Sequence, residues 1–290
     1  MLFRLHPLRH PMMKPPHHHP TRLIGNIAAG MEADLTVIDL ASTPTIEQAT
    51  RRAMRAYHSL RHRAMDAGLL PGQTGYTRFL CVGYARSGST LLMRSLNNHS
   101  RIVGFGEIVK NVDRYPQHYH EFENSQALFE RDPARFLQTK VFRAYPPNVA
   151  AVGFKIFYHH APRDTAWGRA VWEYLLGQPE LRVLHLKRRN WLKMLVSEKQ
   201  AGETEEWIKY SDGQEAPAVH LPPDEAAAFF ARVAAWEAEY DALFAGHPGC
   251  EVVYEQLTRD LPGQLARIQT FLDVPHEAVS PGTAKRPRRA

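Results

Sequence analysis

Cysteine is scarce in this sequence: only Cys81 and Cys250 occur among its 290 residues. Two cysteines cannot form the disulfide framework of a small secreted domain, and both lie in or beside short apolar runs that predict strands. We therefore expect buried free thiols and a cytoplasmic protein. No run of about 18 apolar residues is present, so the sequence predicts no transmembrane helix. The N-terminus also lacks the apolar segment of a secretory signal.

Acidic residues are absent from residues 1–23, which contain five prolines and five histidines. This composition predicts a disordered tail. Residues 17–19 are three histidines, but a proline-flanked histidine run is more typical of a loose tail than of a metal site, and we expect no metal. The net charge of +6 suits an anionic ligand, and equally nucleic acid or a membrane surface. We expect no specific nucleic-acid partner, because much of the excess charge lies in the two tails.

The stretch at 24–46 begins IGNIAAGMEADLTVID. It resembles the C-terminal β-element of amidohydrolases such as guanine deaminase. The resemblance includes no metal ligand, so it implies no deaminase activity and favours a fusion remnant or a wrongly assigned start codon. Residues 45–67 then predict a basic helix. We divide the chain into an N-terminal extension, residues 1–73, and a main domain, residues 74–290.

The segment that opens the main domain combines a strand, a glycine-bounded loop and a helix start. The apolar run at 79–82 predicts a buried strand, and leucines at helical spacing follow Ser89. Backbone N–H groups and the helix dipole favour an anion at such a helix start. The segment therefore predicts a phosphate cradle. Its candidate residues are Arg86, Ser87, Gly88, Ser89 and Thr90.

One residue of a nucleotide-binding P-loop is missing from this cradle. Gly83 and Gly88 have the G-x-x-x-x-G spacing and Thr90 takes the Ser/Thr position, but Ser89 stands where the motif requires lysine. That lysine reaches the β- and γ-phosphates of a nucleotide, and the hydroxyl after it serves magnesium. Its absence argues against ATP or GTP and favours an anion that needs no metal.

A second predicted anion site follows the strand predicted at 181–186. Residues 187–189 are three cations before a helix predicted from Trp191, where arginine forks and the helix dipole suit a phosphate. If Asn190 caps this helix, Ser197 lies about two turns along it, so Arg189 and Ser197 could share only a ligand that spans the gap. The alternative is a solvated basic turn and a core-facing serine.

The two segments together resemble the signatures of one family. Residues 84–92, YARSGSTLL, resemble the 5′-phosphosulfate loop of sulfotransferases that use 3′-phosphoadenylyl sulfate (PAPS), in the form of the bacterial and carbohydrate branch. The 3′-phosphate motif of that family is an arginine with a serine eight positions later, a spacing that Arg189 and Ser197 share. The resemblance covers roughly residues 76–275. It implies that PAPS is held by Arg86, residues 87–90, Arg189 and Ser197.

Predicted strands and helices alternate along the main domain, which favours a parallel sheet with helices on both faces. The expected strands lie at 79–82, 151–157, 181–186 and 251–254, and the main helices lie from 89 onward and at 126–138, 167–176, 191–201, 224–244 (capped by Asp224) and 262–272. The resemblance implies an α/β, P-loop NTPase-like three-layer fold with a central, mostly parallel sheet, beside the partly disordered extension. Sites in such sheets lie at the carboxyl ends of strands, so the segments after Val82, Phe157 and Leu186 should converge.

The activity implied by the resemblance is transfer of a sulfuryl group from PAPS to a hydroxyl of a carbohydrate or glycolipid. We interpret Glu107, which follows a flexible glycine-containing approach, as the general base, because related carbohydrate sulfotransferases have a glutamate in a similar place. Its alternatives are a helix cap or a pair with Lys110. His159 and His160 are the rival bases, since histidine titrates near neutral pH. Lys155, in an apolar strand, either offsets charge on the leaving oxygen or is a paired edge-strand lysine.

Other functions remain open on the sequence alone. A P-loop kinase or other nucleotide-binding protein would prefer ATP with magnesium, and a non-enzymatic basic module would bind anions through its tails. An inactive fusion product is the third alternative. We expect residues 108–148 and 202–222 to form the acceptor pocket, with 111–148 as a lid. The sequence leaves the oligomeric state open.

Overall fold

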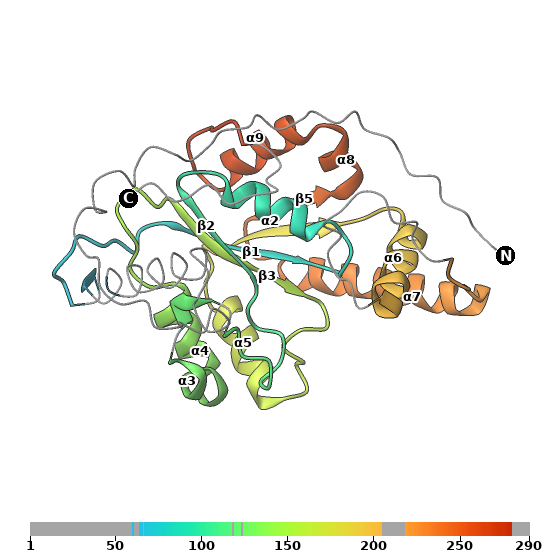
Figure 1. The fold of residues 1–290 in the computed structure, drawn as a ribbon, viewed down its shortest axis with the longest axis horizontal. Helices are drawn as coiled ribbons and strands as arrows, with labels where there is room; N and C mark the ends of the chain where they lie inside the picture. Colours follow the sequence, from blue (N-terminus) through green and yellow to red (C-terminus); the bar gives the residue numbers. More distant parts are fainter. Residues whose placement is uncertain are drawn as a thin grey trace, which may run out of the picture.

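A single parallel sheet forms the centre of the molecule. The computed structural model describes residues 60, 64–65, 67–117, 119–122, 124–204 and 218–279. Within these ranges the sheet has the order β2-β3-β1-β4-β5, and every neighbouring pair of strands is parallel (Figure 1). The strands are β1 (Thr77–Gly83), β2 (Ile102–Glu107), β3 (Ala151–Phe157), β4 (Arg182–Lys187) and β5 (Gly249–Val253). The predicted tail, the amidohydrolase-like stretch and most of the helix predicted at 45–67 lie outside the described residues, and the domain boundary at residue 74 stays a prediction.

Helices cover both faces of this sheet, as the alternating pattern predicts. They are α2 (Ser89–Asn97), α3 (Gln126–Arg131), α4 (Pro133–Phe136), α5 (Ala166–Leu176), α6 (Trp191–Thr204), α7 (Pro223–Leu243), α8 (Tyr254–Arg259) and α9 (Leu261–Phe271), with a 3₁₀ turn η1 (His120–Phe122) and a π-helical turn η2 (Leu137–Val141). Helices α2, α8 and α9 lie on one side of the sheet, and α5 and α7 lie on the other (Figure 1). The three-layer α/β fold is thereby confirmed.

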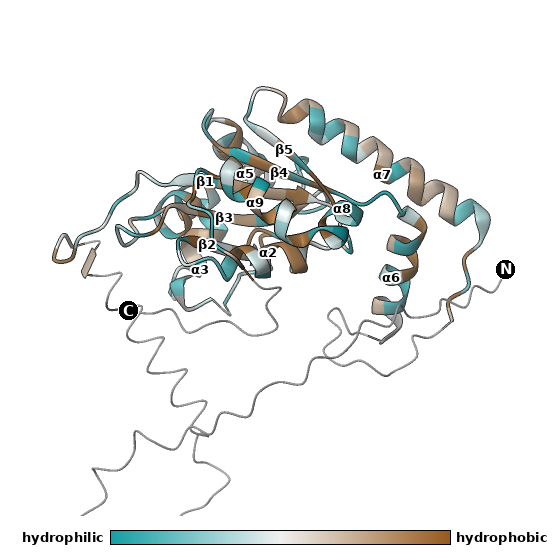
Figure 2. Ribbon diagram, turned by 90° about the horizontal axis from the view of Figure 1, so that it is seen from above, coloured by the Kyte–Doolittle hydropathy of each residue, from teal (hydrophilic) through white to brown (hydrophobic). Residues whose placement is uncertain are grey.

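The two layers of core arise from the alternation of side chains along the strands. In β1, Phe79 and Cys81 pack into the cluster that contains α2, α8 and α9, whereas Leu80 and Val82 pack into the cluster beneath α5 and α7. All four are buried, and the strands are largely hydrophobic in Figure 2. Burial on both faces is the reason that β1 reads as a continuous apolar run rather than as an alternating one.

Strand β1 also marks the point where the chain changes direction across the sheet. It pairs with β3 on one side and with β4 on the other. In open parallel sheets a crevice forms at such a switch point, outside the carboxyl ends of the strands. The loops that follow β1 and β4 are therefore neighbours, and the segment after β3 lies beside them.

Three expectations about local structure are wrong. The helix predicted at 126–138 is broken, because Asp132 accepts a hydrogen bond from Arg135 N and Pro133 begins a new helix. Helix α7 begins after Pro222, so Asp224 lies in its first turn and makes no capping bond. Tyr254 begins α8 instead of ending β5.

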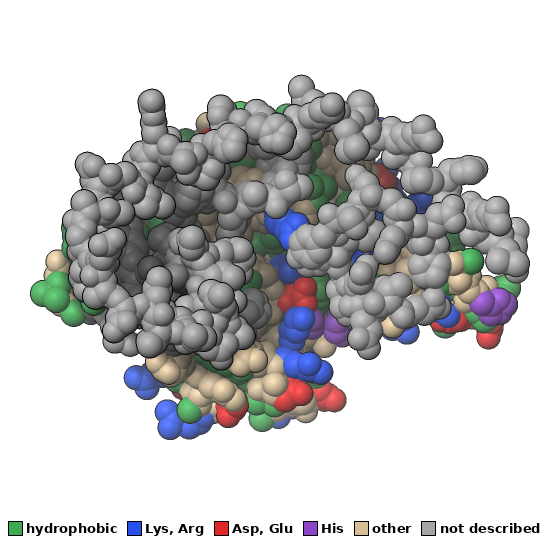
Figure 3. Space-filling model, viewed as in Figure 1, with side chains coloured by type: hydrophobic (Ala, Val, Ile, Leu, Met, Phe, Trp, Pro, Cys, Tyr) green, Lys and Arg blue, Asp and Glu red, His purple; other side chains and the backbone are tan. Residues whose placement is uncertain are grey.

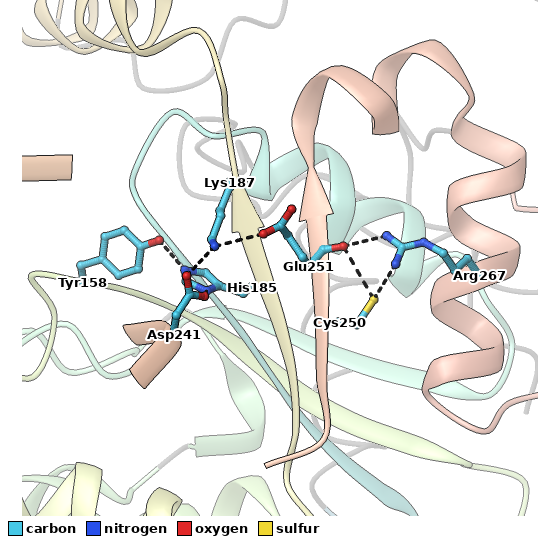
Figure 4. A network of polar contacts seen from close by, with 7 residues as sticks. All are labelled: Tyr158, His185, Lys187, Asp241, Cys250, Glu251 and Arg267. Carbon is cyan, nitrogen blue, oxygen red and sulfur yellow. Dashed lines mark hydrogen bonds and ion pairs between the residues drawn. The ribbon is translucent and has the colours of Figure 1, made fainter. Parts of the chain in front are cut away.

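A network of polar contacts connects β4 to α7 and β5, with His185 buried and the carboxylates of Asp241 and Glu251 exposed (Figure 4). Tyr158, just after β3, contacts His185 of β4 at 2.6 Å, and the other ring nitrogen of His185 contacts Asp241 of α7 at 2.8 Å. Lys187, at the end of β4, binds Asp241 at 2.7 Å and Glu251 of β5 at 3.0 Å. Desolvation lowers the pKa of His185, so the ring is neutral at pH 7. The network connects α7 to β4 directly, and through His185 and Lys187 to Tyr158 and β5.

Both cysteines are buried and free, as expected. None of the helices in the described part of the chain combines the length and the apolarity needed to cross a bilayer. Helix α7 runs along the sheet and past its end, where α6 stands beside its N-terminal half (Figures 1 and 2).

Candidate active site

The phosphate loop, residues 84–90, contains the predicted phosphate cradle and connects β1 to α2. Two of its residues have a left-handed backbone. Arg86 has φ 63° and Gly88 has φ 93°. The hydroxyl of Ser87 is buried and donates to the carbonyl of Tyr84 at 2.6 Å, which closes the loop on itself. Gly88 could carry no side chain, because an added Cβ would lie 2.2 Å from the ring of Tyr254. Ser89 and Thr90 form the first turn of α2, so the loop holds the helix start that the sequence predicts.

The phosphate loop contacts the start and the body of α6. The Arg86 guanidinium donates to the hydroxyl of Ser197 from Nε at 2.9 Å and from Nη2 at 2.8 Å. The Arg188 guanidinium donates to the Arg86 carbonyl at 2.8 Å. The two segments predicted to hold anions are therefore in direct contact. Ser197, however, meets Arg86 in this structure rather than a partner shared with Arg189.

The three cations of residues 187–189 do not act together. Lys187 turns away to the network of Figure 4, and Arg188 holds the phosphate loop. Arg189 is exposed, and its backbone N–H donates to Glu255 at 3.1 Å. Asn190 caps α6 as expected, because its Oδ1 accepts from Lys193 N at 2.9 Å.

A hollow of about 490 Å³ opens beside this helix start. Its lining residues are Arg189, Asn190, Trp191, Leu192, Phe230 and Glu255. The lining combines aromatic and aliphatic surface with one cation and one carboxylate, and its aromatic part suits a flat organic group. The hollow adjoins the phosphate loop, because Glu255 follows the Tyr254 ring that packs on Gly88.

Glu107 lies at the carboxyl end of β2 between two lysines. Its carboxylate binds Lys155 Nζ at 2.9 Å and Lys110 Nζ at 2.8 Å. Burial raises the pKa of Glu107, but the two lysines outweigh it and hold the pKa at about 2. The expected pair with Lys110 is thus present, and the alternative of a helix cap is wrong because Glu107 is in a strand. The approach is not a flexible loop either: Gly104 and Gly106 are strand residues.

Lys155 connects this carboxylate to the phosphate loop. It is buried, and its Nζ also donates to the Ser89 hydroxyl at 3.4 Å. Strand β3 lies between β2 and β1, so the alternative of an edge-strand lysine is wrong. A buried cation next to a predicted phosphate cradle is positioned to meet a negatively charged group held there.

The two histidines after β3 lie beside the lysine–glutamate cluster but differ from each other. His159 is exposed, and its ring lies 4.6 Å from that of His160, centroid to centroid. His160 is buried, and its Nδ1 accepts from the N–H of Phe157 at 3.2 Å. Desolvation holds the pKa of His160 at about 3. His160 is therefore a neutral structural acceptor, and His159 is the rival base that remains. In Figure 3 a band of charged side chains with a histidine beside it crosses the middle of the face shown.

Several contacts at this site are invisible in the sequence. The pairs Arg86–Ser197, Arg188–Arg86 and Glu255–Arg189 join residues more than 60 positions apart. The repeated cations at 187–189 indicated a site there, but not which of them faces it. Glu255 lies within the family resemblance, but the sequence did not mark it as a site residue.

Among the described residues, no group of three or more histidine, cysteine, aspartate or glutamate side chains is placed to hold a metal ion.

Comparison with known proteins decides the family. The profile of the sulfotransferase family matches residues 79–278, which include both predicted anion segments. The chain belongs to the sulfotransferase family. It is 27% identical over 204 residues to nodulation protein H of Rhizobium meliloti strain 1021, covering 68% of this chain and 77% of that protein, and 28% identical over 205 residues to nodulation protein H of Rhizobium tropici, covering 68% and 76%.

The crystal structure of a sulfotransferase from Alicyclobacillus acidocaldarius matches with a TM-score of 0.43 and 16% identity, over 72% of this chain and 86% of that one. The match to the family profile runs from β1 to the segment after α9, so it includes the phosphate loop and α6.

Proposed function

We propose that this sulfotransferase moves a sulfuryl group from PAPS to a hydroxyl of a carbohydrate or glycolipid. The observation that carries the proposal is the direct contact between the phosphate loop and the α6 segment, through Arg86–Ser197 and Arg188–Arg86. A donor with two anionic ends needs two cationic loops side by side. Ser89, in place of the P-loop lysine, speaks against ATP.

The residues of the crevice fit such a donor. The Nε–H of Arg188 is buried and has no partner among the described residues, so this guanidinium keeps one unused hydrogen-bond donor beside the phosphate loop. The phosphate loop offers Arg86 and the N–H groups at the start of α2, where the helix dipole also favours an anion. When bound, the donor supplies an activated sulfuryl group whose bond to the 5′-phosphate oxygen can break.

Glu107 is proposed to take the proton of the acceptor hydroxyl. The acceptor oxygen bonds to sulfur, the bond from sulfur to the 5′-phosphate oxygen breaks, and adenosine 3′,5′-bisphosphate leaves. A carboxylate with a pKa of about 2 is a weak base. Lys155 can change this, because an anionic group near Ser89 would draw the ammonium away from Glu107 and raise the pKa of the carboxyl. Lys155 would then offset the charge that develops on the leaving oxygen.

The acceptor class rests on the carbohydrate-type form of the phosphate loop. His159, next to the same cluster, is the alternative base. The lid expected at 111–148 is proposed to cover the acceptor, since β2 leads into it directly from Glu107.

The proposal is tested by measuring donor binding first and product formation second. Calorimetry should detect PAPS and adenosine 3′,5′-bisphosphate at micromolar concentration without magnesium, and weaker binding after Arg189→Ala. Mass spectrometry of a glycan panel should then detect a sulfated product, which Glu107→Gln should reduce on the order of 10²-fold or more. Preference for ATP with magnesium would refute the proposal. Full activity of Glu107→Gln would refute only the base and transfer that role to His159.

A further inference from the structure

The first two residues of α8 contact both anion segments at once. The ring of Tyr254 packs against Gly88, and the Arg188 guanidinium lies over the same ring, 4.7 Å from its centroid. The Glu255 carboxylate accepts the N–H groups of residues 189–190 at 3.1 and 3.0 Å. One junction, between β5 and α8, therefore touches the phosphate loop and the start of α6.

Arg188 completes the connection between the loops. While its guanidinium rests on the Tyr254 ring, it donates to the carbonyl of Arg86. Arg86 has a left-handed backbone, which is costly for a residue with a side chain and persists only where neighbours hold it. The hydrogen bond from Arg188 to the Arg86 carbonyl stabilises this backbone conformation.

We infer that Tyr254, Glu255 and Arg188 form a brace that fixes the phosphate loop relative to the start of α6, so that one nucleotide can reach both. The inference rests on the proposed function, because the brace positions residues for a donor with two anionic ends. Glu255 and Tyr254 are positioning residues: Tyr254 acts through Gly88 and Arg188, and Glu255 acts through the backbone of residues 189–190.

The chemistry of Glu255 separates the brace from a competing role. The α6 start is a natural anion site, and a carboxylate already occupies two of its N–H groups. Burial raises the pKa of Glu255, but the backbone N–H donors of residues 189–190 outweigh it and keep the carboxyl ionised. If this carboxylate were a plug that the donor must displace, its removal would strengthen binding. If it is a brace, its removal lets the α6 start shift and weakens binding.

The test measures binding of adenosine 3′,5′-bisphosphate to the full chain by calorimetry, with the melting temperature recorded for each variant. Glu255→Ala should weaken binding roughly ten- to hundredfold, the range for a lost hydrogen-bonded charge, and Glu255→Gln should fall between it and the wild type. The KM for PAPS should rise more than kcat falls. Glu255→Gln, which keeps one acceptor oxygen, carries the test if Glu255→Ala does not fold.

Two matched controls separate the brace from general destabilisation. Glu251→Ala removes a carboxylate of β5. This carboxylate binds Lys187 at the end of β4 and contacts neither the phosphate loop nor the start of α6, so its loss should leave the nucleotide affinity unchanged. Tyr254→Phe keeps the ring and should bind like the wild type, whereas Tyr254→Ala should bind more weakly.

Equal or tighter binding by Glu255→Ala, in a protein whose wild type binds, would overturn the brace and leave the proposed function standing. Absence of nucleotide binding by the wild type would overturn the proposed function, and the brace with it.

Discussion

The chemistry of Glu107 depends on the two lysines beside it. Lys110 and Lys155 hold its pKa at about 2. Lys110→Gln should raise that pKa, and the acid limb of the pH profile of kcat/KM should move to higher pH. Lys155→Gln should move the same limb but also lower kcat on the order of 10²-fold, the cost of losing one charge-stabilising group.

A matched lysine provides the control for this prediction. Lys199 binds Glu225 at 2.7 Å between α6 and α7, away from Glu107. Lys199→Gln should leave the pH profile in place. If Lys110→Gln also left it in place, Glu107 would not be the group that titrates in the profile.

Gly88 is the second residue with a sharp expectation. Gly88→Ala would place a Cβ 2.2 Å from Tyr254 at a φ of 93°, so it should lower the free energy of unfolding by about 1–3 kcal/mol and abolish donor binding. Gly202→Ala is the control, because nothing lies within 4 Å of its added Cβ in α6. Gly202→Ala should raise the free energy of unfolding by about 0.5–1 kcal/mol. Thermal denaturation measures the stability change of each variant.

At the scale of elements, helix α6 carries the second anion segment from its cap onward. Asn190→Ala removes the bond to Lys193 N and should cost about 1 kcal/mol of stability together with a measurable loss of donor affinity. Asp260→Ala removes the equivalent bond to Gly263 N at the start of α9 and should cost similar stability at unchanged affinity. If the two variants bound the nucleotide equally well, the cap of α6 would have no role in nucleotide binding.

The elements themselves were largely predictable from local patterns. The strand at 151–157 and the start of α6 at Trp191 agree with the sequence prediction, because apolar run length and a capping asparagine are local signals. The break at Pro133 was also a local signal, since proline begins helices more readily than it continues them. The start of α8 at Tyr254 was not, because an apolar run does not reveal where a strand gives way to a helix.

The site was predictable only as a set of segments. The loop at 84–90 and the pair Arg189 and Ser197 carry recognisable spacing, and the fold brings these segments together. Which partner each side chain meets depends on contacts across the sheet. Ser197 meets Arg86 and not Arg189, a result of the neighbouring positions of β1 and β4 that spacing within one helix cannot show.

At the scale of the whole molecule, acid should destabilise the fold. His160 has a pKa of about 3 in the folded protein against an ordinary value of 6.5, so between these values the unfolded chain binds a proton that the folded one does not. Glu107, lowered from 4.5 to about 2, adds an effect of the same sign at lower pH. Stability should therefore fall as the pH falls from 6.5, by up to about 1.4 kcal/mol per pH unit for each full proton difference.

Urea denaturation between pH 4 and 7 measures this slope. His160→Asn, whose side-chain oxygen can replace the Nδ1 acceptor, should flatten it between pH 4 and 6.5. An unchanged slope would mean that His160 does not titrate on unfolding.

The pairing of β1 with β4 has a consequence for what the crevice can accept. The loop after β1 and the loop after β4 follow adjacent strands. Residues 79–83 of β1 pair in parallel register with residues 182–186 of β4. Strand separation, about 4.8 Å, is one of the least adjustable lengths in a protein. The backbone therefore sets the spacing between the two loops, and with it the length of a ligand that can reach both. Substitutions of side chains should change the affinity for a ligand more readily than they change this length.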